Sequence, residues 1–376
     1  MFSAFTETKE WIHLLDLTDS QIFKLPTRNY SCPDCGLDLL LKRGTVKAPH
    51  FAHLITCPAS SESPSESAVH LEGKHTLYLL AQSHFQDVRI EYYFEVIQQR
   101  ADLYLPTQQV VLEYQCSKIP YMDILTRQFG YTSQKIDCLW ILHTKHIPIC
   151  TKGFYLIKLS QFLQSCIRNH KNGMKSLLFW DSKRNVSYFL FIYDSFAHNE
   201  FIIEIVVLNE MKAWMWLASP KPTSLPERVK QQILYHHQLK QIDFLFSYEN
   251  RETYPYHRLA RKWKVSAPTF PLYIGLATTF THTLGREVKW QFRVVNFMKT
   301  VGDLSRISSV ELAEAFLYSL PNKVLETKEN KEVVSHYIQF LRAYDLPQRH
   351  LKRTSKDLNY IIEWQRFQTL AKPSKN

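Results

Sequence analysis

The stretch Arg100–Ser117, RADLYLPTQQVVLEYQCS, decides the fold prediction because its pattern is typical of a β-hairpin. Apolar and polar residues alternate in its second half, and Pro106–Gln109 supplies the turn. The two middle residues of that turn would form the tip of the hairpin. Two residues that lie the same number of positions before and after the tip then face each other across the strands. This register sets Asp102 directly across from Glu113.

Two carboxylates at that range repel each other, and a divalent cation between them removes the repulsion. Asp102 and Glu113 are therefore predicted ligands of Mg²⁺ or Mn²⁺, which prefer oxygen donors. The alternative is a structural ion pair of Glu113 with Arg100 or Arg127. Gln115 lies two residues beyond Glu113, on the same face of the strand, where it can orient a water molecule for phosphodiester hydrolysis.

A second cluster lies near the start of the sequence, where Cys32 and Cys35 form a Cys-x-x-Cys-Gly turn. Such a turn directs two thiolates at one point and is typical of a zinc knuckle. His53 and Cys57 can supply the remaining ligands, with His50 as the competing nitrogen. The sequence thus predicts a structural Zn²⁺ site that holds together a small lobe with few apolar residues.

The order of the remaining patterns predicts a mixed α/β core. A polar, Ser-rich segment at 59–67 marks a domain boundary, and a helical pattern follows it. We expect a strand at 87–99, the hairpin, a helix at 121–131 that carries Arg127, and a buried strand at 138–143. Three domains are predicted: an N-terminal zinc-binding domain at 1–60, a nuclease-like domain at 61–150 and a C-terminal domain at 151–376.

The C-terminal part begins with alternating strand patterns at 176–196 and 201–208 and continues with helical segments at 227–246, 300–318 and 331–344. A basic run, RLARKWK, follows the first of these helices. A basic run is commonly a solvated face, but the interleaved Trp263 favours a surface that faces nucleic acid. The predicted DNA contacts are Arg127, Arg258, Arg261, Lys262 and Lys264.

Composition narrows the class of protein. The formal net charge is +11, which favours an anionic partner such as nucleic acid. Only 9 glycines occur, and neither a phosphate-binding loop nor a dinucleotide fingerprint is present. Seven cysteines, without a secretory signal or a membrane-spanning run, indicate a reducing compartment, so we expect a cytoplasmic protein without membrane insertion.

The hairpin resembles the PD-(D/E)xK nuclease pattern in its D…ExQ spacing. In that pattern the third residue is commonly lysine, which neutralises developing charge, and here Gln115 replaces it. Lys74 or Lys118 could supply the charge from nearby. Glu66, on the preceding helix, matches the additional acidic residue that many such enzymes carry. The resemblance thus implies a catalytic set of Glu66, Lys74, Asp102, Glu113 and Gln115.

Over roughly residues 1–145 the chain closely resembles the competence protein CoiA-like family, through CPDCG, KRG, HFAH, ESAVHLEGK, RADLYLP and VVLEYQCS in order. The resemblance implies a restriction-endonuclease-like mixed-sheet core, preceded by a zinc-binding lobe and followed by a mostly helical C-terminal domain. It also implies action on incoming DNA, expected to be single-stranded, during natural transformation and alongside recombination proteins. Two functions remain open, a Mg²⁺-dependent deoxyribonuclease and an inactive DNA-binding adaptor. A zinc-dependent transcription factor is disfavoured because no helix-turn-helix or finger array is present.

Overall fold

The computed structural model describes residues 1–33, 35–43, 48–55, 67–209, 221–247, 250–280, 282–301, 304, 306–321, 325–346 and 358–371. Its chain divides into two compact units. The chain first crosses between them after Gly153 and then returns to the first unit. Unit 1 comprises Met1–Gly153, Leu159–Phe191 and Glu204–Pro222, and unit 2 comprises Phe154–Lys158, Ile192–Ile203 and Thr223–Asn376.

The N-terminal lobe of unit 1 is a five-stranded antiparallel sheet in the order β2-β1-β3-β4-β5. Its short α-helix at Asp19–Lys24 begins with a capping box, because the Thr18 side chain accepts from the backbone of Gln21 while the Gln21 side chain accepts from the backbone of Thr18. A small apolar core that includes Leu14, Leu41 and Phe51 fills the lobe. The elements are β1 (Ser3–Thr6), β2 (Trp11–His13), α1 (Asp19–Lys24), β3 (Tyr30–Ser31), β4 (Asp38–Lys42) and β5 (His50–His53).

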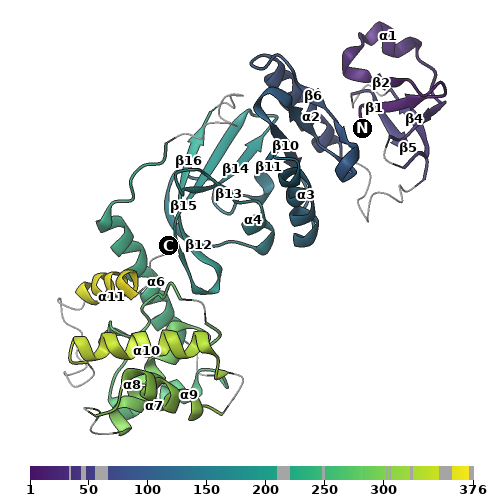
Figure 1. Ribbon diagram of the computed structural model, residues 1–376. Coiled ribbons are helices and arrows are strands. Elements are labelled where there is room, and N and C mark those ends of the chain that lie inside the picture. Colours follow the sequence, from purple (N-terminus) through teal and green to yellow (C-terminus); the bar gives the residue numbers. More distant parts are fainter. Residues whose placement is uncertain are drawn as a thin grey trace. The chain divides into compact units, whose positions relative to one another are not determined.

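The second layer of structure is a mixed nine-stranded sheet, which confirms the predicted mixed α/β class (Figure 1). The path runs β12-β16-β15-β14-β11-β10-β9-β6, with β13 paired to β14. β10, β11 and β14 are mutually parallel neighbours, whereas β6, β9 and β10 pair antiparallel. The helices and strands that follow the N-terminal lobe in sequence are α2 (Ala68–Gln82), β6 (Arg89–Ile90), β7 (Tyr93–Phe94), β8 (Gln99–Arg100), β9 (Leu103–Leu105), β10 (Val110–Gln115), α3 (Tyr121–Ser133), β11 (Asp137–His143), β12 (Gly153–Lys158), α4 (Gln161–Ser165), β13 (Arg168–Asn169), β14 (Lys175–Asp181), β15 (Val186–Phe196) and β16 (Glu200–Leu208).

The β9–β10 hairpin has the predicted register. Val110 pairs with Leu105 and Leu112 with Leu103, so the next step of the ladder sets Asp102 across from Glu113. The turn itself is a short 3₁₀ segment that ends with Gln109 in the left-handed conformation (φ 55°). This turn is longer than a two-residue hairpin turn, but it is symmetric about the same two central residues. The register of the two strands is therefore unchanged.

The strand predicted at 87–99 is interrupted, and this part of the prediction is wrong. The chain forms β6, breaks at Glu91 and resumes as the two-stranded β7–β8 ribbon. Glu91 adopts a left-handed backbone (φ 52°) and is fully buried. A non-glycine residue is uncommon there, and the kink turns an acidic side chain inward.

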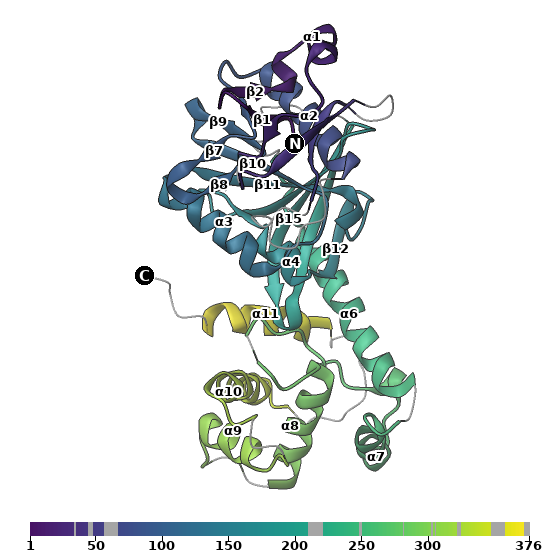
Figure 2. The same ribbon diagram turned by 90° about the vertical axis from the view of Figure 1, so that its right-hand side faces the viewer.

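Helices α2 and α3 cover opposite faces of the sheet. Gly73 of α2 packs on the ring of Tyr114, where an added Cβ would lie only 2.0 Å from a ring carbon. Arg127 and Tyr131 of α3 instead contact Glu113. Because consecutive residues of a strand point to opposite faces, these contacts place the two helices on different sides. α4 lies beside α3 in both views (Figures 1 and 2).

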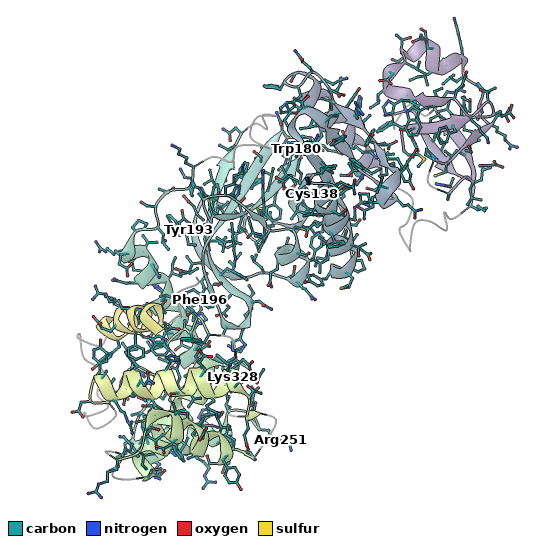
Figure 3. The ribbon with its side chains drawn as sticks, in the orientation of Figure 1. Cys138, Trp180, Tyr193, Phe196, Arg251 and Lys328 are labelled. Atoms are coloured by element: carbon teal, nitrogen blue, oxygen red, sulfur yellow. The ribbon has the colours of Figure 1, made fainter. Side chains whose placement is uncertain are left out.

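Unit 2 is mostly helical, as predicted, and is filled by one large aromatic-rich cluster. The helix predicted at 300–318 is instead the end of one helix and the whole of another, which starts with a capping box at Ser308. Phe196, at the end of β15, joins the cluster of this unit (Figure 3). The helices are α6 (Glu227–Ser247), α7 (Tyr254–Trp263), α8 (Glu287–Val301), α9 (Ser309–Tyr318), α10 (Lys328–Ala343) and α11 (Leu358–Ala371).

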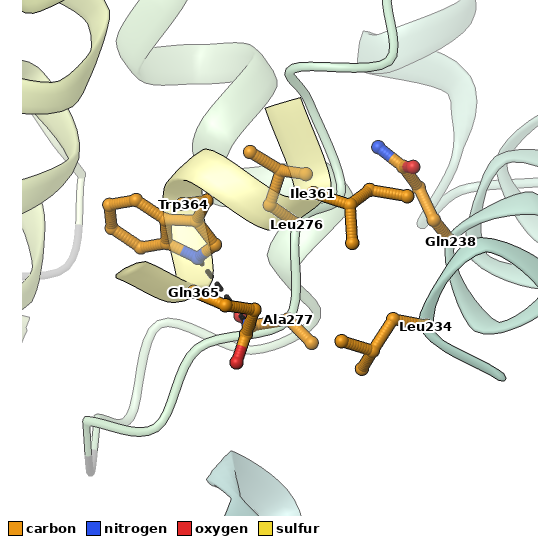
Figure 4. A pocket seen from close by; sticks show the side chains of 7 residues that line it. All are labelled: Leu234, Gln238, Leu276, Ala277, Ile361, Trp364 and Gln365. Carbon is orange, nitrogen blue, oxygen red and sulfur yellow. Dashed lines mark hydrogen bonds between the residues drawn. The ribbon is translucent and has the colours of Figure 1, made fainter. Parts of the chain in front are cut away.

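α11 packs over α6 and the loop before α8. The indole of Trp364 donates to the carbonyl of Ala277 at 2.9 Å, beside a shallow hollow lined by Leu234, Leu276 and Ile361 (Figure 4). The hollow has no room for a water molecule, so it is a packing defect and not a ligand site. Among the helices that the structure describes, none has the length and apolar character needed to cross a membrane.

Candidate functional site

Glu113 lies in the middle of the sheet, only 4% exposed, and is held from the α3 side. Its Oε1 accepts hydrogen bonds from Arg127 Nη2 and from the Tyr131 hydroxyl, both at 2.6 Å. Arg127 also donates to the carbonyl of Arg100 at 2.8 Å. Burial raises the pKa of Glu113, and the adjacent guanidinium opposes that shift. Its second oxygen accepts no hydrogen bond within the described residues, so this atom can take a further ligand.

Asp102 is contacted from the α2 side. Its Oδ2 accepts from the backbone N–H of Tyr114 at 2.9 Å, which fixes the carboxylate against β10. Its Oδ1 lies 3.4 Å from His70 Nε2 and 3.7 Å from Lys74 Nζ. Asp102 and Glu113, which the hairpin register sets across from each other, are thus contacted by side chains from opposite helices.

Lys74 makes a second, closer ion pair with a residue that sequence reasoning missed. Its Nζ lies 2.6 Å from Glu91 Oε1, and both side chains are about 1% exposed. The other oxygen of Glu91 accepts from the backbone N–H groups of Phe2 and Ser3 and from the Ser3 hydroxyl, at 2.7 to 2.9 Å. Glu91 therefore joins the N-terminal lobe to the nuclease-like core. An acidic residue inside the aromatic run RIEYYF was the available signal.

The site is electrostatically balanced within the protein when all its groups are ionised. Three carboxylates face three cationic side chains, and each carboxylate lies within 4 Å of at least one of them. The ion pair of Glu113 with Arg127 is the structural alternative that the sequence left open. The acids are Glu91, Asp102 and Glu113, and the cations are His70, Lys74 and Arg127.

His70 is charged through its contact with Asp102. Burial by itself lowers the pKa of His70, but the Asp102 carboxylate raises it to about 10. The folded-state pKa then exceeds the ordinary value near 6.5, so the pair stabilises the fold fully below about pH 6.5. That contribution is lost as the pH rises through about 10.

We therefore expect the unfolding free energy of the wild type to fall between about pH 6.5 and about pH 10, because the His70–Asp102 attraction disappears. His70→Gln should show a smaller decline over the same range. Urea denaturation at a series of pH values measures both curves, and their difference isolates this one group. Parallel curves for the two proteins would contradict the charged pair.

The other predicted catalytic residues are placed as follows. The Gln115 amide nitrogen donates to the carbonyl of Ser117 at 2.6 Å, which turns it along the strand end. Lys118 is exposed just beyond that strand. Glu66 lies outside the described residues. Of the two lysines proposed to replace the missing one, Lys74 is the one beside a predicted metal ligand.

The N-terminal lobe brings three predicted zinc ligands together. The ligand atoms of Cys32, Cys35 and His53 all lie within 4.8 Å of one another, and Cys35 Sγ is 3.3 Å from His53 Nε2. Sulfur and nitrogen ligands on a tetrahedral zinc lie about 3.5 Å apart, so this pair fits such an ion. His50 is not part of this group because it points to the opposite face of β5. Cys57 lies outside the described residues.

Four of the predicted DNA contacts, Arg258, Arg261, Lys262 and Lys264, are exposed on the last turns of α7 and at its C-cap. The fifth, Arg127, lies on α3 and is paired with Glu113. Helix α7 buries Tyr256 on its other side. The structure therefore gathers four cations on one helix end in unit 2, whereas the acidic site belongs to unit 1.

Comparison with known proteins agrees with this architecture. Residues 66–216 match the model for the nuclease-like domain of competence protein CoiA, and residues 14–60 match the model for its N-terminal domain. The chain is 34% identical over 152 residues to competence protein CoiA of Bacillus subtilis (strain 168), an alignment that covers 40% of each protein. No solved structure matches.

These matches and the fold define a protein in which a small lobe with metal-ligand side chains precedes a nuclease-like domain in the sequence. The chain belongs to the competence protein CoiA family, through residues 14–60 and 66–216. It spans about two fifths of the length of the curated relative it matches.

Proposed function

We propose that this protein processes incoming DNA during natural transformation, as a metal-dependent deoxyribonuclease. The observation that carries the proposal is the hairpin register that sets Asp102 across from Glu113, with Lys74 Nζ 3.7 Å from Asp102. This arrangement supplies two acids and a nearby lysine although Gln115 stands at the usual lysine position. We further propose cytoplasmic action on single-stranded DNA beside recombination proteins.

The free oxygen of Glu113 and the carboxylate of Asp102 would hold Mg²⁺ or Mn²⁺, which polarises a phosphoryl oxygen and lowers the pKa of bound water. Protonated His70 and Lys74 hold positive charge beside Asp102, where it would offset the negative charge of a bound phosphate. Arg127 keeps the buried Glu113 ionised until a cation or a phosphate competes for either partner.

A specific observation also favours the second candidate, a DNA-binding adaptor without turnover. The carboxylates are already compensated by side chains, and Glu113 is paired with Arg127 at 2.6 Å. A divalent ion is then not required for charge balance, and Gln115 cannot neutralise a developing charge. The two candidates share the fold and differ in whether a metal ion enters the site.

Cleavage by the purified protein separates them. We expect Mg²⁺- or Mn²⁺-dependent degradation of labelled DNA, and a loss of at least about a hundredfold in Asp102→Asn and Glu113→Gln. These changes keep shape and remove charge. Asp123→Asn, an exposed carboxylate at the start of α3, is the matched control and should keep full activity.

Single- and double-stranded substrates are compared in the same assay. Tight binding of intact DNA with either metal, unchanged in the two site variants, would overturn the nuclease and leave the adaptor.

For the N-terminal lobe we propose a structural Zn²⁺ on Cys32, Cys35 and His53, with Cys57 as the fourth ligand. The Cys35–His53 distance supports it. The ion would fix the turn after β3, where Gly36 takes a left-handed backbone (φ 72°) and donates to the carbonyl of Cys32 at 2.9 Å.

We propose that the exposed end of α7 contacts the phosphate backbone of DNA. Each phosphate contact releases counterions, so binding weakens with salt. The double variant Arg258→Ala/Lys262→Ala should bind more weakly and should lower the slope of log affinity against log salt by about 2. The control Lys240→Ala/Lys328→Ala removes two exposed charges from other helices and should leave the slope unchanged. Equal slopes for both variants would show that α7 carries only a solvated face.

A further inference from the structure

A second cluster of metal-ligand side chains lies in unit 2, built from three separate segments of chain. His198 is at the tip of the β15–β16 hairpin, His282 is in the loop before α8, and Glu287 is the first residue of α8. Their ligand atoms all lie within 4.8 Å of one another. No spacing pattern in the sequence connects them, and sequence reasoning therefore missed them.

Among the described residues, the buried His282 has no hydrogen-bond partner. Its side chain is 0% exposed, and neither ring nitrogen has a partner within the described part of the chain. Nε2 lies 3.8 Å from Glu287 Oε1, which is too long for a hydrogen bond. An unsatisfied buried imidazole costs about 1–3 kcal/mol, so it calls for an explanation. A bound cation gives one, because it supplies the missing partner.

The other two side chains are oriented as metal ligands commonly are. His198 Nε2 lies 2.9 Å from the carbonyl of Gly285, to which it donates, and this leaves the lone pair on Nδ1. Glu287 Oε2 accepts from the amide of Gln241 at 3.1 Å, and Gln241 Oε1 in turn accepts from the backbone N–H of Val288. Such supporting bonds fix the ligating atoms in place.

The hairpin tip is held toward the cluster by the backbone as well. Ala197 N–H donates to the carbonyl of Thr278 at 2.9 Å, which ties the start of the turn to the loop that carries His282. His198 and Asn199 both take left-handed backbones (φ 61°), where a two-residue turn usually has Asn-Gly. A histidine tolerated in that conformation is consistent with a role for its side chain.

We propose that His198, His282 and Glu287 bind a divalent transition-metal ion of the zinc class. Two imidazoles and one carboxylate are a zinc donor set that leaves a fourth position open to water or to a ligand. Nitrogen and oxygen ligands on tetrahedral zinc lie about 3.3 Å apart, so small side-chain rotations close the present cluster. The ion would cross-link the β15–β16 hairpin to the start of α8 inside unit 2.

A shared proton between His282 and Glu287 is the competing explanation. It requires neither His198 nor a metal, and it predicts no bound ion. The proposed site is distinguished from the N-terminal cluster by its donors, because only the latter contains thiolates.

The test uses the full chain in which Cys32→Ser and Cys35→Ser remove the thiolate site. After loading with Zn²⁺ and dialysis, this protein should retain about one zinc per chain by elemental analysis. Loaded with Co²⁺, it should show visible d–d bands without a thiolate charge-transfer band. Adding His282→Ala or Glu287→Ala should abolish both signals, whereas His236→Ala, an exposed histidine on α6, should change neither.

Because His282 is buried, its variant can lose the fold together with the metal. His198→Gln guards against that outcome, since His198 is exposed and its change leaves the core intact. Loss of zinc in a folded His198→Gln protein, judged by circular dichroism, supports the site. Zinc retained in His198→Gln, or no zinc bound by the thiolate-free parent, overturns it.

Discussion

Lys74→Met should destabilise the protein by about 3–5 kcal/mol, the usual cost of removing one partner from a buried ion pair. Lys74 Nζ lies 2.6 Å from Glu91 Oε1, and both side chains are about 1% exposed. The change would leave Glu91 buried with its three hydrogen bonds from Phe2 and Ser3 but without the ammonium group of Lys74. Since whole domains have about 5–15 kcal/mol of stability, the effect should be plain in urea denaturation.

Two comparisons make this result specific. Lys118→Met removes an exposed lysine and should change stability by less than about 0.5 kcal/mol. The double variant Lys74→Met/Glu91→Gln should recover part of the loss, because it no longer buries a lone charge. A single variant as stable as the wild type would show that Glu91 is protonated in the folded protein.

The second large effect concerns the N-terminal lobe. His53→Ala should abolish zinc binding and unfold residues of the lobe, because structural zinc contributes about 10–16 kcal/mol to the folding of small zinc domains. Its own apolar core is small, so the ion would supply much of the stability. Zinc content by elemental analysis and amide hydrogen exchange of β3–β5 measure the two consequences.

His50→Ala is a control on the same strand. His50 Nδ1 lies 2.8 Å from the carbonyl of Ala48, and its side chain points to the other face of β5. This variant should keep its zinc and its exchange protection. Equal metal loss in both histidine variants would mean that His50 also binds the zinc ion in solution.

The carboxylate pair shows how far local sequence patterns lead. Strand alternation and a symmetric turn were enough to set Asp102 across from Glu113, since both depend on neighbours in sequence. The same reasoning placed Cys32 and Cys35 at one turn. It could not choose between His50 and His53, because that choice depends on which face of β5 packs toward the cysteines.

Helix α2 shows where local patterns mislead. The residues His70 and Lys74 lie four apart with Glu66 and suggest a polar, solvated face. In the structure Lys74 is buried, since Glu91 and Asp102 reach it from segments outside its own helix. Partners supplied by tertiary contacts are invisible to periodicity, so the polar face could not be recognised as buried.

The sequence by itself determined the mixed α/β order, the hairpin register and the Cys-x-x-Cys turn, because each depends on residues within one or two elements. Only the tertiary structure decided which charges meet. It paired Glu113 with Arg127, joined Glu91 to Lys74 and the first strand, and brought His198, His282 and Glu287 together. The physical reason is that buried charges take their partners from whatever segments the packed core brings within a few ångströms.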